Sequence, residues 1–257
     1  MIQTIDFQIE ALKDMKKYPK LFYLGNLALL NSKKISVVGS RKPNQYARSL
    51  TQELCSKLSA HGVTIVSGGA IGIDAIAHKS AGAEHTIMVA GTGLDTRYPA
   101  INKALISDIE QKGLVLSQFE SGTTSKKYNF PLRNELIVAL GEILVVAYGD
   151  LNSGTSRSVE YAQKMGKEIY VFPHRIGESE GTNKLLQDGI AKAIYDIDSF
   201  VSMFEEESQN RIEADEFLLF CRKNPNYEDV IRYDAQKLFA YELQGKVEVK
   251  NLKVYVL

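Results

Sequence analysis

Short hydrophobic runs alternate with amphipathic segments from Lys33 to about Phe204. The runs are rich in β-branched residues and contain few polar positions, which is typical of strands buried on both faces of a parallel sheet. We expect strands over 35–38, 63–66, 86–90, 113–117, 143–146 and 168–172. Helical spacing of hydrophobic residues predicts helices over 45–60, 74–81, 101–111, 132–140 and 155–165. This alternation predicts an α/β fold with an extended Rossmann-like, doubly wound, mostly parallel sheet over 33–204.

The two ends of the chain follow other patterns. Residues 1–32 look helical and amphipathic but are too few for a core of their own, so we interpret them as an N-terminal helical extension. The polar residues 205–210 are interpreted as a linker. Helices are expected over 212–221, 227–231 and 235–243, followed by alternating segments over 246–249 and 252–256. This order predicts a small winged-helix-like domain over 211–257.

Composition indicates a folded protein and limits the kinds of surface it can have. The 257 residues are 44% hydrophobic and 24% charged, with 31 basic and 31 acidic side chains. A net charge of zero argues against a broad cationic surface for nucleic acids. However, residues 1–204 hold 23 Lys and Arg against 20 Asp and Glu, and several of these cations follow predicted strands. A local basic groove therefore remains compatible with the composition.

Cysteines, histidines and hydrophobic segments indicate the compartment. Cys55 and Cys221 lie far apart in helix-like contexts, so we expect buried free thiols and a reducing cytoplasm. The four histidines lack metal-ligand spacing, and we expect neither a metal nor a cofactor. No run approaches the ~18 apolar residues of a membrane span, and the N-terminus lacks a signal-peptide pattern. The expected protein is cytoplasmic and has no membrane partner.

Two glycine-containing turns follow predicted strands. Gly39-Ser40-Arg41 would place backbone amides and a guanidinium where a phosphate could bind, although a tight turn with an exposed arginine explains it equally well. The turn over 67–74 contains three glycines that allow close approach of a ligand or of a neighbouring element, and Asp74 is expected to cap the next helix. Neither turn matches the GxGxxG fingerprint or a P-loop, which argues against dinucleotide binding and ATP hydrolysis.

A basic and aromatic stretch precedes the predicted helix over 132–140. Lys126, Lys127 and Arg133 lie between Glu120 and Glu135 with no acidic residue among them. Tyr128 and Phe130 are interspersed with these cations. Cations that hold phosphates and rings that stack on bases make up single-strand sites. The alternative is a solvated loop with one aromatic ring anchored in the core.

Several motifs in one order resemble the DNA processing protein A family, also called DprA or Smf. These motifs are GSR, SGGAIGIDAIAHKSA, TIMVAGTGLDTRYPAINKAL, SQFESG and FPLRNELIVAL, and the resemblance covers roughly Leu21 to Ile194. It implies a Rossmann-like sheet and a function without catalysis. Members bind single-stranded DNA that enters the cytoplasm in natural transformation, protect it, and help load the RecA recombinase, usually as dimers.

The resemblance implies a DNA site at the strand ends. Its residues would be Gly39, Ser40, Arg41, Gly68, Gly69, Lys126, Lys127, Phe130, Arg133, Asn134 and Arg157. One of the two lysines would contact phosphate, and Phe130 would stack on a base or be buried under the following helix. Ile71 and Glu135 stand where the family often has arginine, and Arg157 would restore a positive charge nearby. Duplex binding by the C-terminal domain is not secured, because Lys237 is the only cation in 234–243.

A nucleotide-processing enzyme is the alternative of a different class. Rossmann-like phosphoribohydrolases use a glycine turn followed by a threonine and an acid on one helix. Gly154, Thr155 and Glu160 faintly resemble that layout. Glu160 would then serve as a general acid or base for a nucleoside monophosphate. A surface carboxylate explains the same residue.

Overall fold

The structure is a computed structural model, and it describes residues 1–13, 15, 17–151, 153–204 and 216–256. It contains two compact units, Met1–Val201 and Ser202–Leu257. The predicted linker over 205–210 lies outside the described residues, as does the start of the helix predicted over 212–221. Each unit has its own hydrophobic core and is described by itself below.

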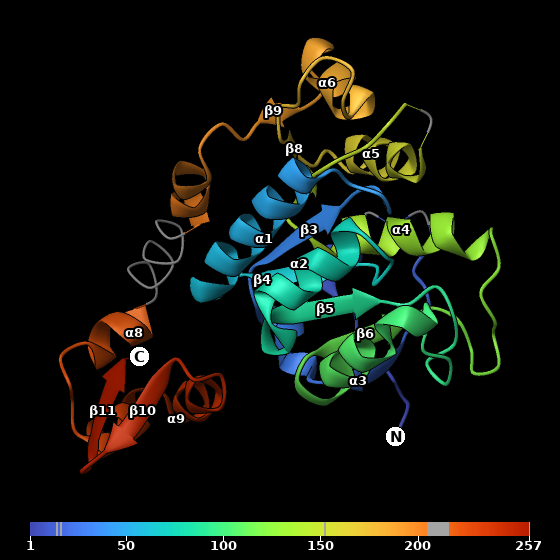
Figure 1. Cartoon of the computed structure of the whole chain (residues 1–257). Helices are drawn as coiled ribbons and strands as arrows, with labels where there is room; N and C mark the ends of the chain where they lie inside the picture. The colour runs from blue at the N-terminus through green and yellow to red at the C-terminus, as the bar shows by residue number, and fades with distance from the viewer. Residues whose placement is uncertain (14, 16, 152, 205–215, 257) are drawn as a thin grey trace. The chain divides into compact units, whose positions relative to one another are not determined.

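A nine-stranded sheet forms the centre of the first unit, in the order β1-β2-β6-β5-β4-β3-β7-β8-β9 (Figure 1). Strands β3 to β9 are parallel to one another, whereas β2 pairs antiparallel with β6 and β1 pairs antiparallel with β2. The strands are β1 (Gln3–Thr4), β2 (Phe22–Gly25), β3 (Lys34–Val38), β4 (Thr64–Ser67), β5 (Thr86–Val89), β6 (Leu114–Ser117), β7 (Ile143–Val146), β8 (Ile169–Val171) and β9 (Lys192–Ala193). The predicted doubly wound, mostly parallel sheet is confirmed.

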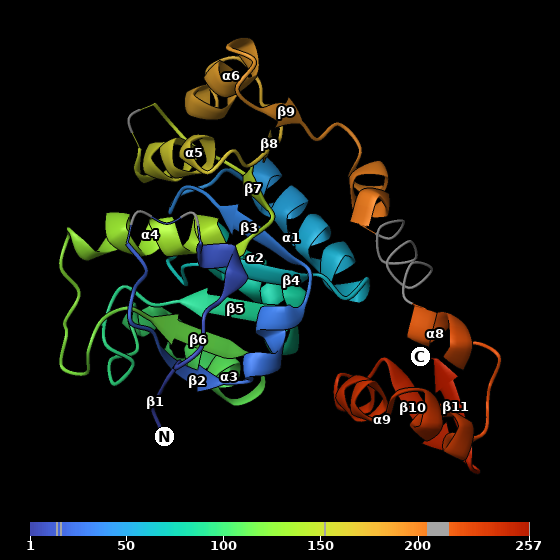
Figure 2. The same ribbon diagram turned by 180° about the vertical axis from the view of Figure 1, so that it is seen from behind.

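Helices cover both faces of this sheet. They are α1 (Gln45–Ala60), α2 (Ile73–Ala81), α3 (Lys103–Lys112), α4 (Asn129–Leu140), α5 (Gly154–Lys164) and α6 (Glu180–Gln187). Helices α1, α2 and α3 lie on one face (Figure 1), and α4 and α5 lie on the other (Figure 2). The faces differ because the chain runs outward from β3 to β6 and then returns to β7 on the opposite side of β3.

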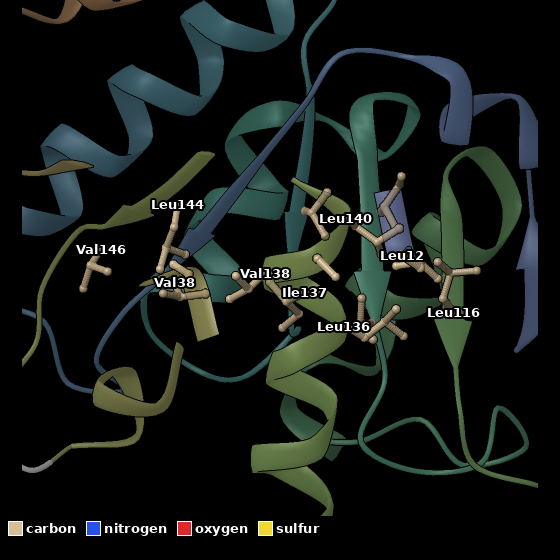
Figure 3. Packing of buried hydrophobic residues seen from close by; sticks show 14 of the residues in the cluster. Leu12, Val38, Leu116, Leu136, Ile137, Val138, Leu140, Leu144 and Val146 are labelled. Atoms are coloured by element: carbon tan, nitrogen blue, oxygen red, sulfur yellow. The ribbon is translucent and has the colours of Figure 1, made fainter. Parts of the chain in front are cut away.

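The second half of helix α4 is fully buried. Its residues Leu136 to Leu140 are all buried and pack with Val38, Leu116, Leu144 and Val146 of the sheet (Figure 3). The 3-10 turn η1 (Glu10–Leu12) covers the helix with Leu12, which is itself fully buried. Because one side of α4 faces the sheet and another faces η1, the helix needs no polar stripe, and its sequence shows no amphipathic pattern.

The predicted helical extension over 1–32 is wrong. This segment contains the strands β1 and β2 and the 3-10 turns η1 and η2 (Leu27–Asn31), and it belongs to the first unit. Strand β2 pairs with β6 in the register Phe22 to Ser117. Its hydrogen-bond partners therefore come from a strand far along the chain, which local periodicity cannot reveal.

The second unit contains α8 (Glu216–Cys221), α9 (Tyr227–Leu243) and the antiparallel hairpin β10 (Val247–Lys250) and β11 (Lys253–Val256). Helix α9 is broken at Asp234, whose φ of −164° and ψ of 93° are not helical, so it corresponds to the two short helices predicted there. The core consists of Phe217, Leu218, Cys221, Val230, Leu238, Val247 and Val254. Three helical segments followed by a hairpin match the predicted small domain.

The cysteines and the helices bear on the expected compartment. Cys55 and Cys221 are buried free thiols, and burial raises the pKa of Cys55. None of the helices in the described ranges is long and apolar enough to cross a membrane. Within the same ranges, no group of three or more His, Cys, Asp or Glu could hold a metal ion.

Gly72 lies between β4 and the start of α2, where it packs against the turn after β3. Its φ of +84° and ψ of −131° lie in a region that L side chains rarely adopt, and an added Cβ would lie 2.7 Å from the Cα of Arg41. We expect Gly72→Ala to lower the free energy of unfolding by about 3 kcal/mol, through backbone strain and overlap together. Chemical denaturation followed by circular dichroism measures this.

Gly62→Ala is the matched control. Gly62 also has a positive φ, of +74°, but an added Cβ there would meet nothing within 4 Å. The free energy of unfolding of this variant should fall by only about 1–2 kcal/mol, because only the backbone conformation is strained. Equal losses in the two variants would show that the close approach at Gly72 has no energetic weight.

His78 makes the stability of the first unit sensitive to acid. Burial lowers the pKa of His78 to about 3, and the positive charge of Arg133 adds to this shift. Below a pH of about 6.5 the unfolded chain therefore binds a proton that the folded chain does not, and the free energy of unfolding falls by about 1.4 kcal/mol per pH unit.

When the pH falls from about 7.5 to about 5.5, the free energy of unfolding of the wild type should fall by about 1.4 kcal/mol more than that of His78→Asn. Denaturation of both proteins at both pH values measures this difference, and the titration of every other group cancels in it. If the two proteins lose stability equally, the His78 imidazole does not titrate as its burial implies.

Candidate nucleic-acid-binding site

A cavity of about 520 Å³ lies at the carboxyl ends of β3, β4 and β7. Strands β3 and β7 are neighbours from which the chain leaves in opposite directions, and such a switch point is where open α/β sheets bind ligands. Its lining comes from the turn after β3, the start of α2, the first turns of α4 and the start of α5. A second cavity, of about 70 Å³, shares four lining residues with it: Arg41, Ala70, Phe130 and Arg133.

The GSR turn has a different structure from the one predicted. The Ser40 N–H donates to the Tyr148 carbonyl at 2.8 Å, and the Lys42 N–H donates to Ser40 Oγ at 3.1 Å. Helix α1 starts only at Gln45, where Asn44 caps it. These amides are therefore engaged within the protein, and the turn does not lead directly into α1. Arg41 is exposed and lines both cavities, so its side chain carries the charge of this turn.

The glycines of the second turn make room for a side chain. Gly68 accepts a hydrogen bond from Arg133 Nη1, and an added Cβ on Gly68 would overlap that guanidinium. Gly69 is buried, and its carbonyl accepts from Asn102 Nδ2 at 2.9 Å. Of the two alternatives for this turn, the structure shows close approach of a neighbouring element at both glycines. Gly68 also lines the smaller cavity.

Asp74 does not cap α2, because it lies inside the helix at its second position. Its carboxylate is buried and accepts from the Ala70 N–H at 3.3 Å. Burial raises the pKa of Asp74, and the nearby Arg133 opposes that shift. Asp74 therefore belongs to a buried polar cluster with Arg133 below the cavity.

Arg133 is a buried cation, only 4% exposed. Its Nη1 donates to the carbonyls of Gly68 and Val89, the latter at 2.5 Å, and its Nε donates to Asn134 Oδ1 at 3.2 Å. Burial lowers the pKa of Arg133, and Asp74 counters this. The guanidinium thus ties the ends of β4 and β5 together while it also lines both cavities.

Phe130 lies close to two guanidiniums. The centre of its ring is 5.6 Å from Arg41 Cζ and 5.9 Å from Arg133 Cζ, within the range of cation–π contacts. The Tyr98 ring lies 5.9 Å away, centre to centre. Gly91 leaves space for the ring, because an added Cβ there would be 3.0 Å from it. Phe130 is half-buried and lines both cavities, so it is not simply covered by α4.

The two candidate lysines lie outside the cavity. Lys126 and Lys127 are exposed on the loop between β6 and α4, which projects from the body of the first unit (Figure 1). Asn129 anchors the end of this loop, since its Nδ2 donates to Gly91 O at 3.0 Å and to Thr124 O at 3.2 Å. Helix α4 therefore starts at Asn129, three residues before the predicted start.

Two further candidates have different surroundings. Asn134 is half-buried and lines the larger cavity. Arg157 is not part of that lining; it is exposed on α5 and forms an ion pair with Glu160 at 2.7 Å. The structure therefore does not place Arg157 in the lining of this cavity.

Sequence reasoning missed several residues at this site. Tyr98 reaches Phe130 from the loop after β5, and only its position in the motif TIMVAGTGLDTRYPAINKAL could have indicated it. Asp150, Ser153 and Ser158 also line the larger cavity, together with Thr155, which the sequence suggested only for the phosphoribohydrolase alternative. They follow β7, so the general rule that ligands bind at strand ends was the available signal.

Comparisons with known proteins identify the family and agree with the fold. A family model described as DNA recombination-mediator protein A matches residues 6–205. DNA processing protein DprA of Streptococcus pneumoniae is 38% identical over 189 residues, 72% of this chain and 66% of that protein. Protein Smf of Escherichia coli is 36% identical over 178 residues, 67% of this chain and 48% of that protein. The chain thus spans about half to two thirds of these relatives.

Two solved structures share the fold. DNA processing protein A from Helicobacter pylori, described for its single-stranded DNA binding mode, is 36% identical with a TM-score of 0.78, over 80% of this chain and 96% of that one. DprA from Streptococcus pneumoniae is 35% identical with a TM-score of 0.72, over 79% and 73% of the two chains. The chain therefore belongs to the DNA recombination-mediator protein A family, whose members are named DNA processing protein A, DprA or Smf.

Proposed function

We propose that this protein binds single-stranded DNA at the cavity above β3, β4 and β7. The observation that carries the proposal is the Phe130 ring at the cavity wall, close to both Arg41 and Arg133. An aromatic face beside cations provides both contacts that a single strand needs, stacking for a base and charge for its phosphates. The Helicobacter pylori relative, described for its single-stranded DNA binding mode, supports the same ligand.

Each side chain has a distinct part in this proposal. Arg41 is exposed and can hold a phosphate with its planar guanidinium. Phe130 offers its ring to a base, and Arg133 adds positive charge from below while its hydrogen bonds stay within the protein. Lys126 and Lys127 meet the DNA backbone beside the cavity, and both are exposed enough to do so.

The biological role proposed here is that of the family. The protein would protect DNA that enters the cytoplasm in natural transformation and help load the RecA recombinase onto it, as a homodimer and without catalysing a reaction. Membership of the DNA recombination-mediator protein A family supports this role. Mass determination in solution with and without an oligonucleotide tests the homodimer.

The larger cavity does not have the layout that the phosphoribohydrolase alternative needs. Glu160 is paired with Arg157 on the surface of α5 and does not line the larger cavity, whereas Thr155 does. A general acid or base must lie within hydrogen-bond reach of the substrate that it serves. Thr155 and Glu160 are therefore not brought together at the cavity proposed for DNA, whereas both line a separate cavity of about 250 Å³.

The second unit is not proposed as a duplex-binding domain. In the second half of α9, Lys237 lies over the rings of Phe217 and Tyr241, with its Nζ at 5.8 and 5.6 Å from their centres. The one cation of the candidate recognition helix is thus engaged within its own unit. A contact with a second copy or a protein partner fits this surface better than phosphate binding does.

Salt dependence tests the charge part of the proposal. Affinity for single-stranded DNA should fall linearly on a log–log plot against salt, with a slope of about −0.7 for each neutralised phosphate. Arg41→Ala should weaken binding and make the slope shallower by about 0.7. Fluorescence anisotropy with a labelled oligonucleotide over a salt series measures both quantities.

Lys164→Ala is the matched control for Arg41→Ala. It also removes one exposed cation, but at the last residue of α5, about 15 Å along that helix from the end that lines the cavity. It should leave affinity and slope unchanged. A flat salt dependence of the wild type would contradict the proposed function, and equal effects of the two variants would remove Arg41 from the site.

Phe130 tests the stacking part. Phe130→Ala should weaken single-strand binding by about 5-fold to 150-fold, the usual range for one stacked base, with little change in the salt slope. Phe130→Tyr keeps the aromatic face and should bind within about twofold of the wild type. If Phe130→Tyr loses as much affinity as Phe130→Ala at equal thermal stability, Phe130 does not act as a stacking face.

A further inference from the structure

A third cavity, of about 590 Å³, lies next to the DNA site. Its walls are residues 44–46 at the start of α1, and residues 173–175 with Glu178 after β8. Strand β8 is parallel to β7, so this cavity lies at the same edge of the sheet as the first one. None of its lining residues lines the first cavity.

The wall of this third cavity is held in place before any ligand binds. The His174 ring packs edge-on against Tyr46 and Tyr148, with ring centres 5.6 and 5.1 Å apart. His174 Nε2 lies 3.0 Å from the Ala147 carbonyl and donates to it. Asn183 Nδ2 donates to the carbonyls of His174 and Glu178, at 3.2 and 3.1 Å, which fixes the loop after β8.

Its polar groups suit a base better than a phosphate. Glu178 accepts from Asn44 Nδ2 at 3.0 Å, and its carboxylate would repel a phosphate but can accept from the amino group of a base. His174 Nε2 is engaged with the Ala147 carbonyl, and Nδ1 is buried without a partner among the described residues. Tyr46 is 49% exposed, so its ring has a free face for stacking.

The first and third cavities are lined by residues only two positions apart in the chain. Lys42 lines the first cavity and Asn44 lines the third, and their Cα atoms can be no more than about 7.6 Å apart. Tyr148 connects them from below, because its carbonyl holds the Ser40 N–H while its ring contacts His174. A strand whose phosphates lie on Arg41 can therefore continue over residues 43–44 into the third cavity.

We propose that the third cavity binds one unpaired base of the same DNA strand, stacked on Tyr46 and facing Glu178, with Arg175 at its rim for the adjoining phosphate. This inference rests on the proposed function and adds a second base subsite to it. The occupant is a base of single-stranded DNA, since a duplex would hold its bases inside the stack and out of reach of the Tyr46 ring.

An abasic scan tests this subsite. A labelled oligonucleotide carries one abasic position at a time, which removes a single base and keeps every phosphate. Wild-type affinity should drop by about 5-fold or more at two separate positions. Phe130→Ala should abolish the drop at one position, and Tyr46→Ala should abolish it at the other.

Tyr46→Phe keeps the ring and should retain both sensitive positions. Tyr195→Ala removes a ring that is 85% exposed but lies outside the cavity, and it should also retain both. If Tyr46→Ala is poorly folded, Arg175→Ala replaces it. The affinity of Arg175→Ala should fall for oligonucleotides long enough to reach the third cavity. Its affinity for the shortest oligonucleotide that binds should be unchanged.

One sensitive position in the wild type, unaffected by Tyr46→Ala, would overturn the subsite and leave the proposed function intact. No binding of any oligonucleotide by the wild type would overturn the proposed function itself. The two failures are therefore distinguishable in the same experiment.

Discussion

The buried guanidinium of Arg133 is the interaction on which the rest of the first unit depends. A charge taken out of water is very costly unless it is paired and hydrogen-bonded. Arg133 meets this need through three groups: the carbonyls of Gly68 and Val89 at the ends of β4 and β5, and the carboxylate of Asp74 on α2. All three must be in place. The sheet edge, α2 and α4 are thus fixed relative to one another by one side chain.

This arrangement also positions the candidate site. Phe130 lies three residues before Arg133 on α4, on the same helical face, and its ring packs over the guanidinium. Gly68 and Gly91 lack side chains at the two places where a Cβ would press on Arg133 or on the ring. The same buried cation that holds the strands together therefore presents an aromatic face to the cavity, and stability and binding share one group.

Features with local causes could be predicted, whereas features with distant partners could not. Helix α1 and strand β7 begin and end where the pattern places them, since hydrophobic spacing and flanking glycines define them. Strand β2 pairs with β6, which lies far along the chain, so residues 1–32 gave no sign of it. The sequence predicts Arg133 at the site but not its burial. Its acceptors are the carbonyls of Gly68 and Val89, which lie at the ends of β4 and β5, far from α4 in the chain. Arg157 looked similar in sequence, yet its partner is the neighbouring Glu160.

The exposed loop between β6 and α4 separates two stages of ligand capture. Lys126 and Lys127 project into solvent, while Arg41 and Phe130 lie at the cavity wall. Charges at the rim act at a distance and mainly set how often encounters succeed, whereas desolvated contacts mainly set how long a complex lasts. Under the proposed function, the loop governs the association rate and the cavity governs the residence time. A near-neutral protein can in this way capture DNA quickly without holding polyanions over its whole surface.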